Sequence, residues 1–275
     1  MQRRILIIDD HDDLATALDE VFTHVGHQVT VVEERSRALD IDLSGFDLIL
    51  TDLDVADDFS GIAPVNNGSL CPREMPTAAS GEHIKAFKLS AANFRRDNFE
   101  ENQLKDLVAT VLDYKIRFVD KHEIVQGLHE SIEFELPSTI SLMHIVLEYL
   151  MKRVEKVGVC KPEQSNLFVA LDEAFVNAVK HGNKFDSKKM IRVAAEVSRA
   201  EARFTIEDEG DGFDINSIPD PLDPENLFKA SGRGVLFIHN IMDEVTYNER
   251  GNRLTMVKKA PQHADTAPED AKAIK

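Results

Sequence analysis

The first 55 residues constrain the fold most, because three apolar, β-branched segments alternate there with two helical patterns. The apolar segments are RILIIDD (4–10), HQVTVVEE (27–34) and FDLILTDLDV (46–55). Between them, DLATALDEVFTHVG has helical spacing and ends at Gly26, and SRALDIDL is predicted to form a short helix. This β-α-β-α-β alternation predicts an α/β fold with a doubly wound parallel sheet and helices on both faces.

The pattern changes near residue 130. SIEFELP (131–137) alternates like a strand, and an amphipathic helix follows, opened by Ser138 or Thr139 and closed by Gly158. Further along are a helix over 171–183, a hairpin over 190–210, a helix over 234–245 and a hairpin over 244–259 that turns at Gly251-Asn252. This order predicts an α+β sandwich in which helices cover one face of a mixed sheet.

The chain is therefore expected to contain two domains joined by a connector. A long helix over 98–122 closes the first domain, and residues 56–83 read as loops. The predicted boundaries are 1–118 for the first domain, 119–131 for the connector, 132–258 for the second domain and 259–275 for a disordered tail.

Composition excludes several classes of protein. A net charge of -17 argues against a nucleic-acid-binding surface. No apolar run is long enough to span a membrane, and two aspartates interrupt the apolar run that would make the first residues a signal peptide. The two cysteines, Cys71 and Cys160, are too few for a disulfide framework. We expect a cytoplasmic protein.

The segment LDEAFVNAVKHGN (171–183) carries a polar stripe beside its apolar one. Glu173, Asn177 and His181 recur every four residues, so they share one helix face. Such a face either decorates the surface or belongs to a site.

Two glycine-containing segments offer partners for this stripe. Asp208 ends a predicted strand, and Gly210 and Gly212 in the turn that follows allow close approach of a flat ligand. A carboxylate fixed at a strand end accepts a hydrogen bond from an exocyclic amine such as that of adenine. Gly232 and Gly234 precede an apolar helix whose free N-terminal amides suit phosphate.

The three segments LDEAFVNAVKHGN, EDEGDGFD and DPENLFKASGRGVLFIHNIMDEV resemble the N, G1 and G2 boxes of the GHKL ATP-binding domain. That domain is shared by histidine kinases, gyrase and Hsp90-type chaperones. The resemblance covers about residues 130 to 258, and it is nearest to the serine kinases that act as anti-sigma factors in bacterial partner switching.

The resemblance implies ATP and Mg²⁺ as cofactors and assigns roles to residues. Asn177 would ligate Mg²⁺, Asp208 would contact adenine, and Thr255 would add a hydroxyl on the adenine side. Glu173 would be the general base towards the attacking hydroxyl, which suits a reaction that depends on positioning and charge neutralisation. The four glycines would admit the base and phosphates, and a structural hydrogen bond is the expected role of His181.

The N-terminal half resembles the receiver domain of two-component response regulators. Asp9 and Asp10 match the acidic pair that holds Mg²⁺, and Asp52 matches the phospho-acceptor. Thr77 fits the hydroxyl position that senses the phosphoryl group. The lysine of the family should fall in NFRRDNFEEN, where Asp97-Asn98 stands instead and Arg95 or Arg96 is the available substitute. A degenerate receiver that serves as a docking module is the alternative.

The preferred hypothesis is a response regulator whose output is a serine/threonine kinase. Its implied partners are a STAS-domain anti-sigma antagonist as substrate, a sigma factor, an upstream histidine kinase and a second copy in a homodimer. One alternative is a nucleotide-dependent partner-binding module that transfers no phosphate. Another is a histidine kinase, which would need His122 or His129 on a dimerising helical hairpin.

Overall fold

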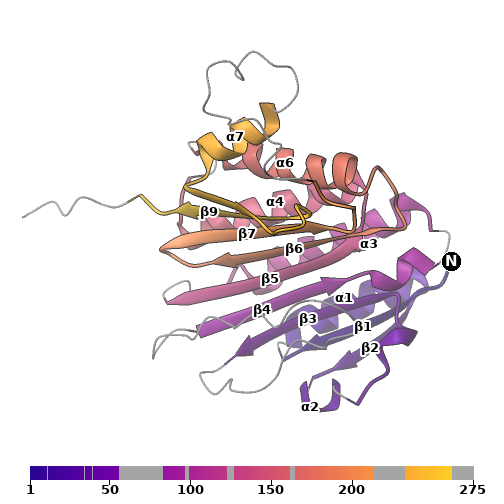
Figure 1. The fold of residues 1–275 in the computed structure, drawn as a ribbon. Helices are drawn as coiled ribbons and strands as arrows, with labels where there is room; N and C mark the ends of the chain where they lie inside the picture. The colour runs from indigo at the N-terminus through magenta and orange to yellow at the C-terminus, as the bar shows by residue number, and fades with distance from the viewer. Residues whose placement is uncertain are drawn as a thin grey trace, which may run out of the picture.

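A single mixed sheet organises the molecule (Figure 1). The structure is a computed structural model that describes residues 1–10, 12–33, 35–38, 40–55, 83–96, 99–122, 127–161, 165–213 and 233–261. Within these residues the sheet has nine strands in the order β2-β1-β3-β4-β5-β6-β7-β9-β8.

The strands and helices have the following bounds. The strands are β1 Arg4–Asp9, β2 Gln28–Val32, β3 Leu48–Val55, β4 His83–Ser90, β5 Leu128–Pro137, β6 Met190–Val197, β7 Glu201–Asp208, β8 Glu244–Tyr247 and β9 Arg253–Lys259. The α-helices are α1 Asp12–Val25, α2 Arg35–Ala38, α3 Glu101–Tyr114, α4 Ile140–Val157, α6 Leu167–Asn177 and α7 Arg233–Ile241. Short 3-10 turns are η1 Leu43–Gly45 and η2 Ala92–Arg96, and π-helical turns are η3 Lys115–Val119 and η4 Ala178–Gly182.

In the N-terminal half, the predicted parallel pairing of the first three strands is confirmed, but the sheet does not continue as a parallel sheet. β2, β1 and β3 are parallel, with Ile7 opposite both Val31 and Leu50. β4, however, runs antiparallel to β3, so the expected doubly wound parallel sheet stops after three strands. The predicted loops over 56–83, the segment between β3 and β4, lie almost entirely outside the described residues.

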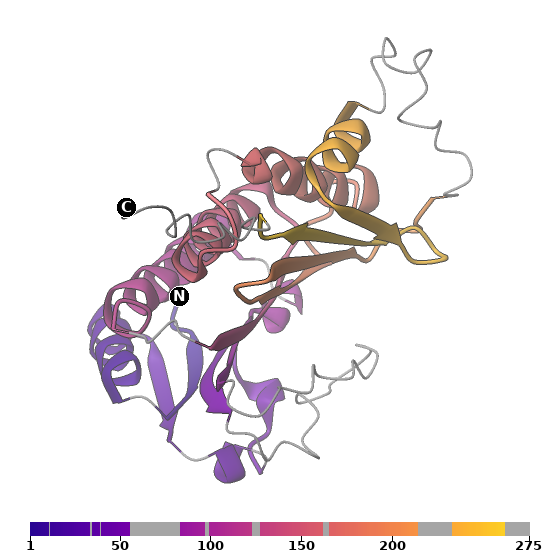
Figure 2. The ribbon, with the colours of Figure 1, turned by 90° about the vertical axis from the view of Figure 1, so that its left-hand side faces the viewer.

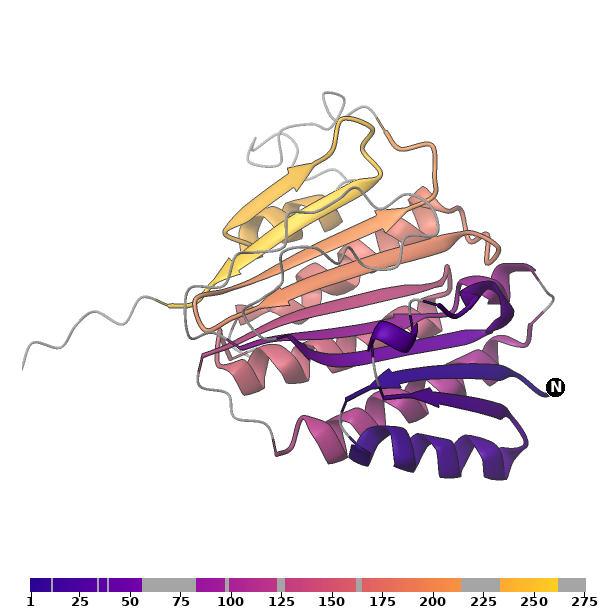
Figure 3. The ribbon, with the colours of Figure 1, turned by 90° about the horizontal axis from the view of Figure 1, so that it is seen from below.

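Helices cover mainly one face of the sheet, as Figure 2 shows for α1, α3, α4, α6 and α7. Figure 3 shows the other face, where most of the strands are in front of the helices. The short α2 is the exception, because Ala38 packs with Leu6 and Ile8 of β1 in a small second core. The alternation along β1 therefore serves two cores, since Ile5 and Ile7 belong to the large one.

The large core runs without interruption across the predicted boundary between the halves. β4 pairs in parallel with β5, and Phe87 of β4 lies 5.8 Å edge-to-face from Phe134 of β5. Tyr149 of α4 completes this group, with its ring 6.0 Å from that of Phe134. The predicted division at 119–131 thus falls between segments that share a sheet and a core.

The C-terminal half has the predicted order of elements. α4 ends at Gly158, whose φ of 85° is the left-handed conformation typical of a helix C-cap. β6 and β7 form the first hairpin, and β8 and β9 form the second through a turn that contains Gly251. In the described part of the chain, no helix is long and apolar enough to cross a membrane.

Candidate functional site

The polar stripe of α6 lies where its spacing predicts. Leu171, Ala174 and Phe175 are buried in the core, whereas Glu173 and Asn177 are only partly covered. Asn177 is the last α-helical residue, and the chain then continues as the π-helical turn η4. Such turns are rare and occur often at functional sites. The helix therefore presents a carboxylate and an amide together just before its geometry changes.

Asp208 ends β7 on the face of the sheet that carries the helices. Its Oδ1 accepts a hydrogen bond of 2.8 Å from the backbone N–H of Gly210. Burial raises the pKa of this carboxyl, and the Gly210 amide opposes part of that rise. A partly desolvated carboxylate in a fixed orientation suits recognition of an amine.

Two glycines let the end of the α6 segment touch the Asp208 loop. A Cβ at Gly182 would lie 2.3 Å from Cγ of Asp208, and a Cβ at Gly210 would lie 2.2 Å from the Gly182 carbonyl oxygen. Any side chain at either position would displace the loop. The sequence analysis did not select Gly182 as a site residue, although its position directly after the polar stripe could have indicated one.

The start of α7 meets the same stripe from a third segment. A Cβ on Gly234 would lie 2.4 Å from Oε2 of Glu173 and 3.6 Å from Nδ2 of Asn177. The N-terminal turn of α7 thus packs against the carboxylate and amide of α6, while the Asp208 loop packs against Gly182 at the end of the same segment. Gly232 lies outside the described residues.

Two predicted roles need revision. The hydroxyls of Thr255 and Thr205 lie 3.1 Å apart in register across β9 and β7. Because side chains alternate along β7, Thr205 and Asp208 occupy opposite faces, so Thr255 lies on the face of the sheet opposite to Asp208. His181 is exposed, and among the described residues we find no hydrogen bond to its imidazole that would give it the expected structural role.

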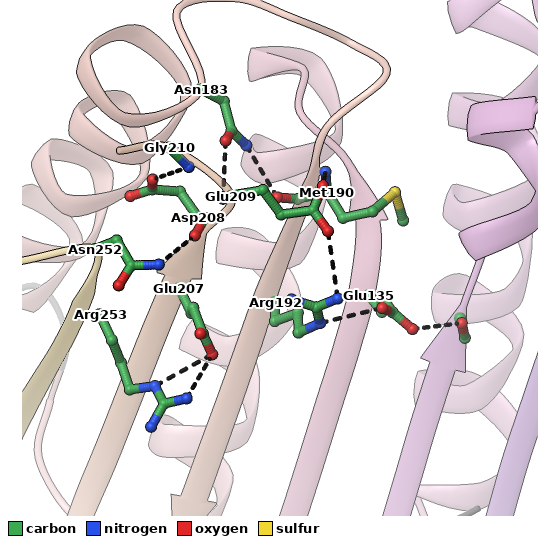
Figure 4. Close-up of polar contacts among 11 residues, drawn as sticks. Glu135, Asn183, Met190, Arg192, Glu207, Asp208, Glu209, Gly210, Asn252 and Arg253 are labelled. Atoms are coloured by element: carbon green, nitrogen blue, oxygen red, sulfur yellow. Dashed lines mark hydrogen bonds and ion pairs between the residues drawn. The ribbon is translucent and has the colours of Figure 1, made fainter. Parts of the chain in front are cut away.

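Two asparagines that the sequence analysis did not select hold the Asp208 loop (Figure 4). Asn183 accepts a hydrogen bond of 2.9 Å from the backbone N–H of Glu209, and Asn252 donates one of 2.8 Å to the carbonyl of Asp208. Asn183 closes the predicted helical segment and Asn252 lies in the final turn. An asparagine in such places reads as a turn residue, so the sequence gave little signal of a role.

The acidic residues of the N-terminal half are arranged differently from the prediction. Asp9 and Asp52 are direct neighbours across β1 and β3, but Oδ2 of Asp9 accepts the backbone N–H of Ala15 at 3.1 Å. Asp52 is 0% exposed, and its Oδ2 accepts a bond of 3.1 Å from Nζ of Lys115. Asp10 is exposed. Among the described residues, no group of three or more His, Cys, Asp or Glu is placed to hold a metal ion.

The lysine expected near residue 97 is replaced by two lysines from elsewhere. Lys115 of η3 contacts Asp52, and Nζ of Lys85 on β4 lies 4.0 Å from its Oδ1. The side chains of Arg95 and Arg96, the residues Asp97-Asn98 and Thr77 lie outside the described parts. A cation does face Asp52, but it comes from a segment that the sequence pattern did not indicate.

Asp52 and Lys115 belong to a larger buried network that reaches into the C-terminal half. Nζ of Lys115 also donates to Asp120 at 3.0 Å, and Arg153 of α4 lies 3.2 Å from Asp120 and 2.7 Å from Glu130 of β5. Burial lowers the pKa of Lys115, but the surrounding carboxylates outweigh it and raise the pKa above its ordinary value. Burial raises the pKa of Glu130, and Arg153 opposes that rise.

The C-terminal residues suit a nucleotide with its metal. Gly182 and Gly210 bring the Asp208 loop into close contact with the end of the α6 segment, and Gly234 brings the start of α7 against the carboxylate of Glu173 and the amide of Asn177. The oxygen of an amide such as that of Asn177 is a ligand that Mg²⁺ accepts, and Mg²⁺ usually binds through few protein groups plus phosphates. The fit therefore extends to both ATP and its metal.

Comparison with known proteins agrees with this geometry. Residues 136–258 match the family model of the histidine kinase-like ATPase domain, so this part of the chain is similar to that class of ATP-binding domains. The chain is also 29% identical over 142 residues to the serine-protein kinase RsbW of Staphylococcus epidermidis, which covers 49% of this chain and 89% of the relative. RsbW of Staphylococcus aureus strain JH9 is 28% identical over the same shares. The resemblance to a receiver stays a prediction.

Proposed function

We propose that the chain is an ATP- and Mg²⁺-dependent serine/threonine protein kinase that phosphorylates a STAS-type anti-sigma factor antagonist in a partner-switching pathway. The similarity to the RsbW serine-protein kinases and to the ATPase family supports an ATP-dependent serine kinase. The observation that carries the proposal is the convergence of Glu173, Asp208 and Gly234 from three separate segments around the end of α6.

Different residues would bind the base, hold the metal at the phosphates and activate the acceptor hydroxyl. The Asp208 carboxylate accepts a hydrogen bond from the exocyclic amine of adenine, and Gly182 and Gly210 allow the close packing that orients this carboxylate. Asn177 supplies an amide oxygen to the metal, which neutralises charge on the phosphates when bound. Glu173, one helical turn before Asn177, accepts the proton of the attacking serine or threonine hydroxyl.

The N-terminal half would carry the regulatory input, received at Asp52 from an upstream histidine kinase. Because Asp52 is fully buried and paired with Lys115, phosphoryl transfer to it requires that this ion pair open first. The same burial favours the alternative in which this half is a degenerate receiver that docks partners without being phosphorylated. A sigma factor and a second copy of the chain are further proposed partners.

The histidine-kinase alternative loses support from the position of its candidate histidines. His129 lies within β5, paired in register with Ile84 of β4, and not on a helical hairpin. His122 lies in the turn that follows η3. Neither position offers the two-helix dimerising segment that this alternative requires.

The decisive experiment separates a kinase from a nucleotide-dependent binding module. Purified chain is incubated with labelled ATP, Mg²⁺ and candidate STAS proteins, with wild type beside Glu173→Gln. We expect acid-stable label on a serine or threonine of the substrate, reduced by roughly 10²–10⁴-fold in the variant, because the general base is lost. ATP affinity should stay within about twofold, since Glu173 does not hold the nucleotide.

Two results would contradict the proposal. Equal phosphorylation by wild type and Glu173→Gln would remove Glu173 from the chemistry, and ATP binding with partner capture but no transfer would favour the binding module. Repeating the assay with beryllofluoride, alone and with Asp52→Asn, tests the input: a change in rate that depends on Asp52 supports a working receiver.

A further inference from the structure

The loop from Asp208 to Gly210 is held by residues that touch its backbone and not its carboxylate. Asn252 is the first of them. It donates from Nδ2 to the Asp208 carbonyl at 2.8 Å, and its own carbonyl accepts the Asp208 N–H at 3.0 Å. The backbone of Asp208 is thus bonded on both sides to the turn between β8 and β9, where Asn252 is itself buried.

Asn183 fixes the next residue from the opposite side. It is 0% exposed and uses both ends of its amide: Oδ1 accepts the N–H of Glu209 at 2.9 Å, and Nδ2 donates to the Met190 carbonyl at 2.9 Å. Its own N–H bonds the carbonyl of Ala178 in η4 at 2.8 Å. One side chain therefore joins the end of the α6 segment, the start of β6 and the loop.

The side chain of Glu209 closes the arrangement. Its Oε2 accepts the N–H of Met190 at 3.0 Å, and its Oε1 lies 3.4 Å from Nη2 of Arg192 (Figure 4). Asn183, Met190 and Glu209 thus form a ring of three hydrogen bonds in which each residue contacts the other two. A ring of this kind leaves the loop little freedom relative to β6.

The chemistry of Asn183 is specific to an amide. The position needs one acceptor for an N–H and one donor for a carbonyl, and both must be made because the side chain is fully buried. Aspartate offers no donor and would place a carboxylate against the Met190 carbonyl, whereas alanine or leucine leaves both backbone groups without this partner.

We propose that Asn183 is a positioning residue that sets base selectivity by holding the Asp208 carboxylate at a fixed distance from Asn177. Asn177 and Asn183 lie at the two ends of the same π-helical turn, so the bond from Asn183 to Glu209 ties the metal-binding end of the site to its base-binding end. The inference rests on the proposed nucleotide-dependent function and adds a determinant of which base is accepted.

The test compares ATP with inosine triphosphate, which lacks the exocyclic amine. Affinity for each is measured by calorimetry on the full chain for wild type and Asn183→Ala. We expect ATP affinity to fall by about tenfold, as for loss of well-placed hydrogen bonds, with affinity for inosine triphosphate nearly unchanged. In the kinase assay, KM for ATP should rise in proportion while kcat at saturating ATP stays near the wild-type value.

The control is Asn93→Ala, which removes an asparagine that donates to the Ser44 carbonyl at 3.1 Å in the N-terminal half. It should leave the ratio of the two affinities unchanged. Should Asn183→Ala fail to fold, Glu209→Ala opens the same ring from its partly exposed side, and it should lower the ratio in the same direction.

The outcomes separate this inference from the function beneath it. If wild type prefers ATP but Asn183→Ala and Glu209→Ala keep the wild-type ratio, Asn183 is only structural and the inference is overturned. If wild type itself binds no ATP, the proposed function fails first.

Discussion

Lys115 offers the sharpest test of how the two halves are joined. Its side chain is 0% exposed, and its Nζ lies 3.1 Å from Asp52 of the N-terminal sheet and 3.0 Å from Asp120. Asp120 in turn contacts Arg153 of α4 at 3.2 Å. The ammonium group is thus the link between β3 and the polar cluster beneath the C-terminal helices.

The perturbation is Lys115→Met, which keeps most of the unbranched side chain and removes its charge. Breaking a buried ion pair by removing one partner costs roughly 3–5 kcal/mol, because the other charge stays buried. Asp52 keeps Lys85 at 4.0 Å and Asp120 keeps Arg153, so we expect the lower end, about 3 kcal/mol. That is a large share of the roughly 5–15 kcal/mol that stabilises a typical protein.

The sign of the pH dependence follows from the raised pKa of Lys115. A raised pKa means that the folded state favours the charged ammonium. The contribution of this group to folding stability is therefore complete below the ordinary pKa of 10.5, and it is lost only as pH rises through the higher pKa of the folded state. The full difference between wild type and Lys115→Met should therefore be present at neutral pH.

The assay is urea unfolding followed by far-UV circular dichroism, since the chain has no tryptophan. Wild type should unfold in one transition, because a single core spans both halves, and Lys115→Met should shift its midpoint down. The double variant Lys115→Met with Asp52→Asn should recover part of the loss, because it removes one stranded carboxylate. A decrease of less than about 1 kcal/mol in the free energy of unfolding of Lys115→Met, or separate unfolding transitions for the two halves, would refute the reasoning.

The remaining predictions concern the nucleotide site. Gly182→Ala should weaken ATP binding by about tenfold or more, because its Cβ would lie 2.3 Å from Cγ of Asp208. Gly158→Ala is the control, because a Cβ there meets no neighbour. It should cost only about 1 kcal/mol of stability, owing to the left-handed φ of Gly158, and leave the ATP affinity measured by calorimetry unchanged. Burial raises the pKa of Asp208 above 3.8, and the ionised carboxylate is a stronger hydrogen-bond acceptor for the adenine amine than the protonated carboxyl group. ATP affinity should therefore fall with decreasing pH at a higher pH than for an ordinary aspartate. The ratio of wild-type to Asp208→Asn affinity, measured by calorimetry across the acidic range, checks this, and a ratio that does not change with pH would contradict it.

Much of the C-terminal half could be predicted because its signals are local. The stripe of Glu173 and Asn177 follows from the helical repeat, and the end of α4 follows from Gly158. The alternation of side chains along a strand also argues against the predicted role of Thr255. Leu254 and Met256 are core residues, so Thr255 between them faces the other side of the sheet.

The N-terminal half shows where local reasoning stops. The apolar runs of β1, β2 and β3 predicted a parallel sheet, and these three strands are parallel. The sequence of β4 does not specify its direction, because a strand of this length can pair in either a parallel or an antiparallel ladder. Its antiparallel pairing with β3 and its parallel pairing with β5 join what were predicted to be two domains.

The sequence by itself determined which residues share a helix face, that α1 and α4 end at Gly26 and Gly158, and which three segments resemble the boxes of an ATP-binding domain. Only the tertiary structure decided that Lys115 meets Asp52 across 63 residues of chain, and that Asn183 holds a loop 26 residues away. The physical reason is that a repeat along the chain reports the environment of each side chain, whereas the partner of a buried polar group depends on which distant segments pack together.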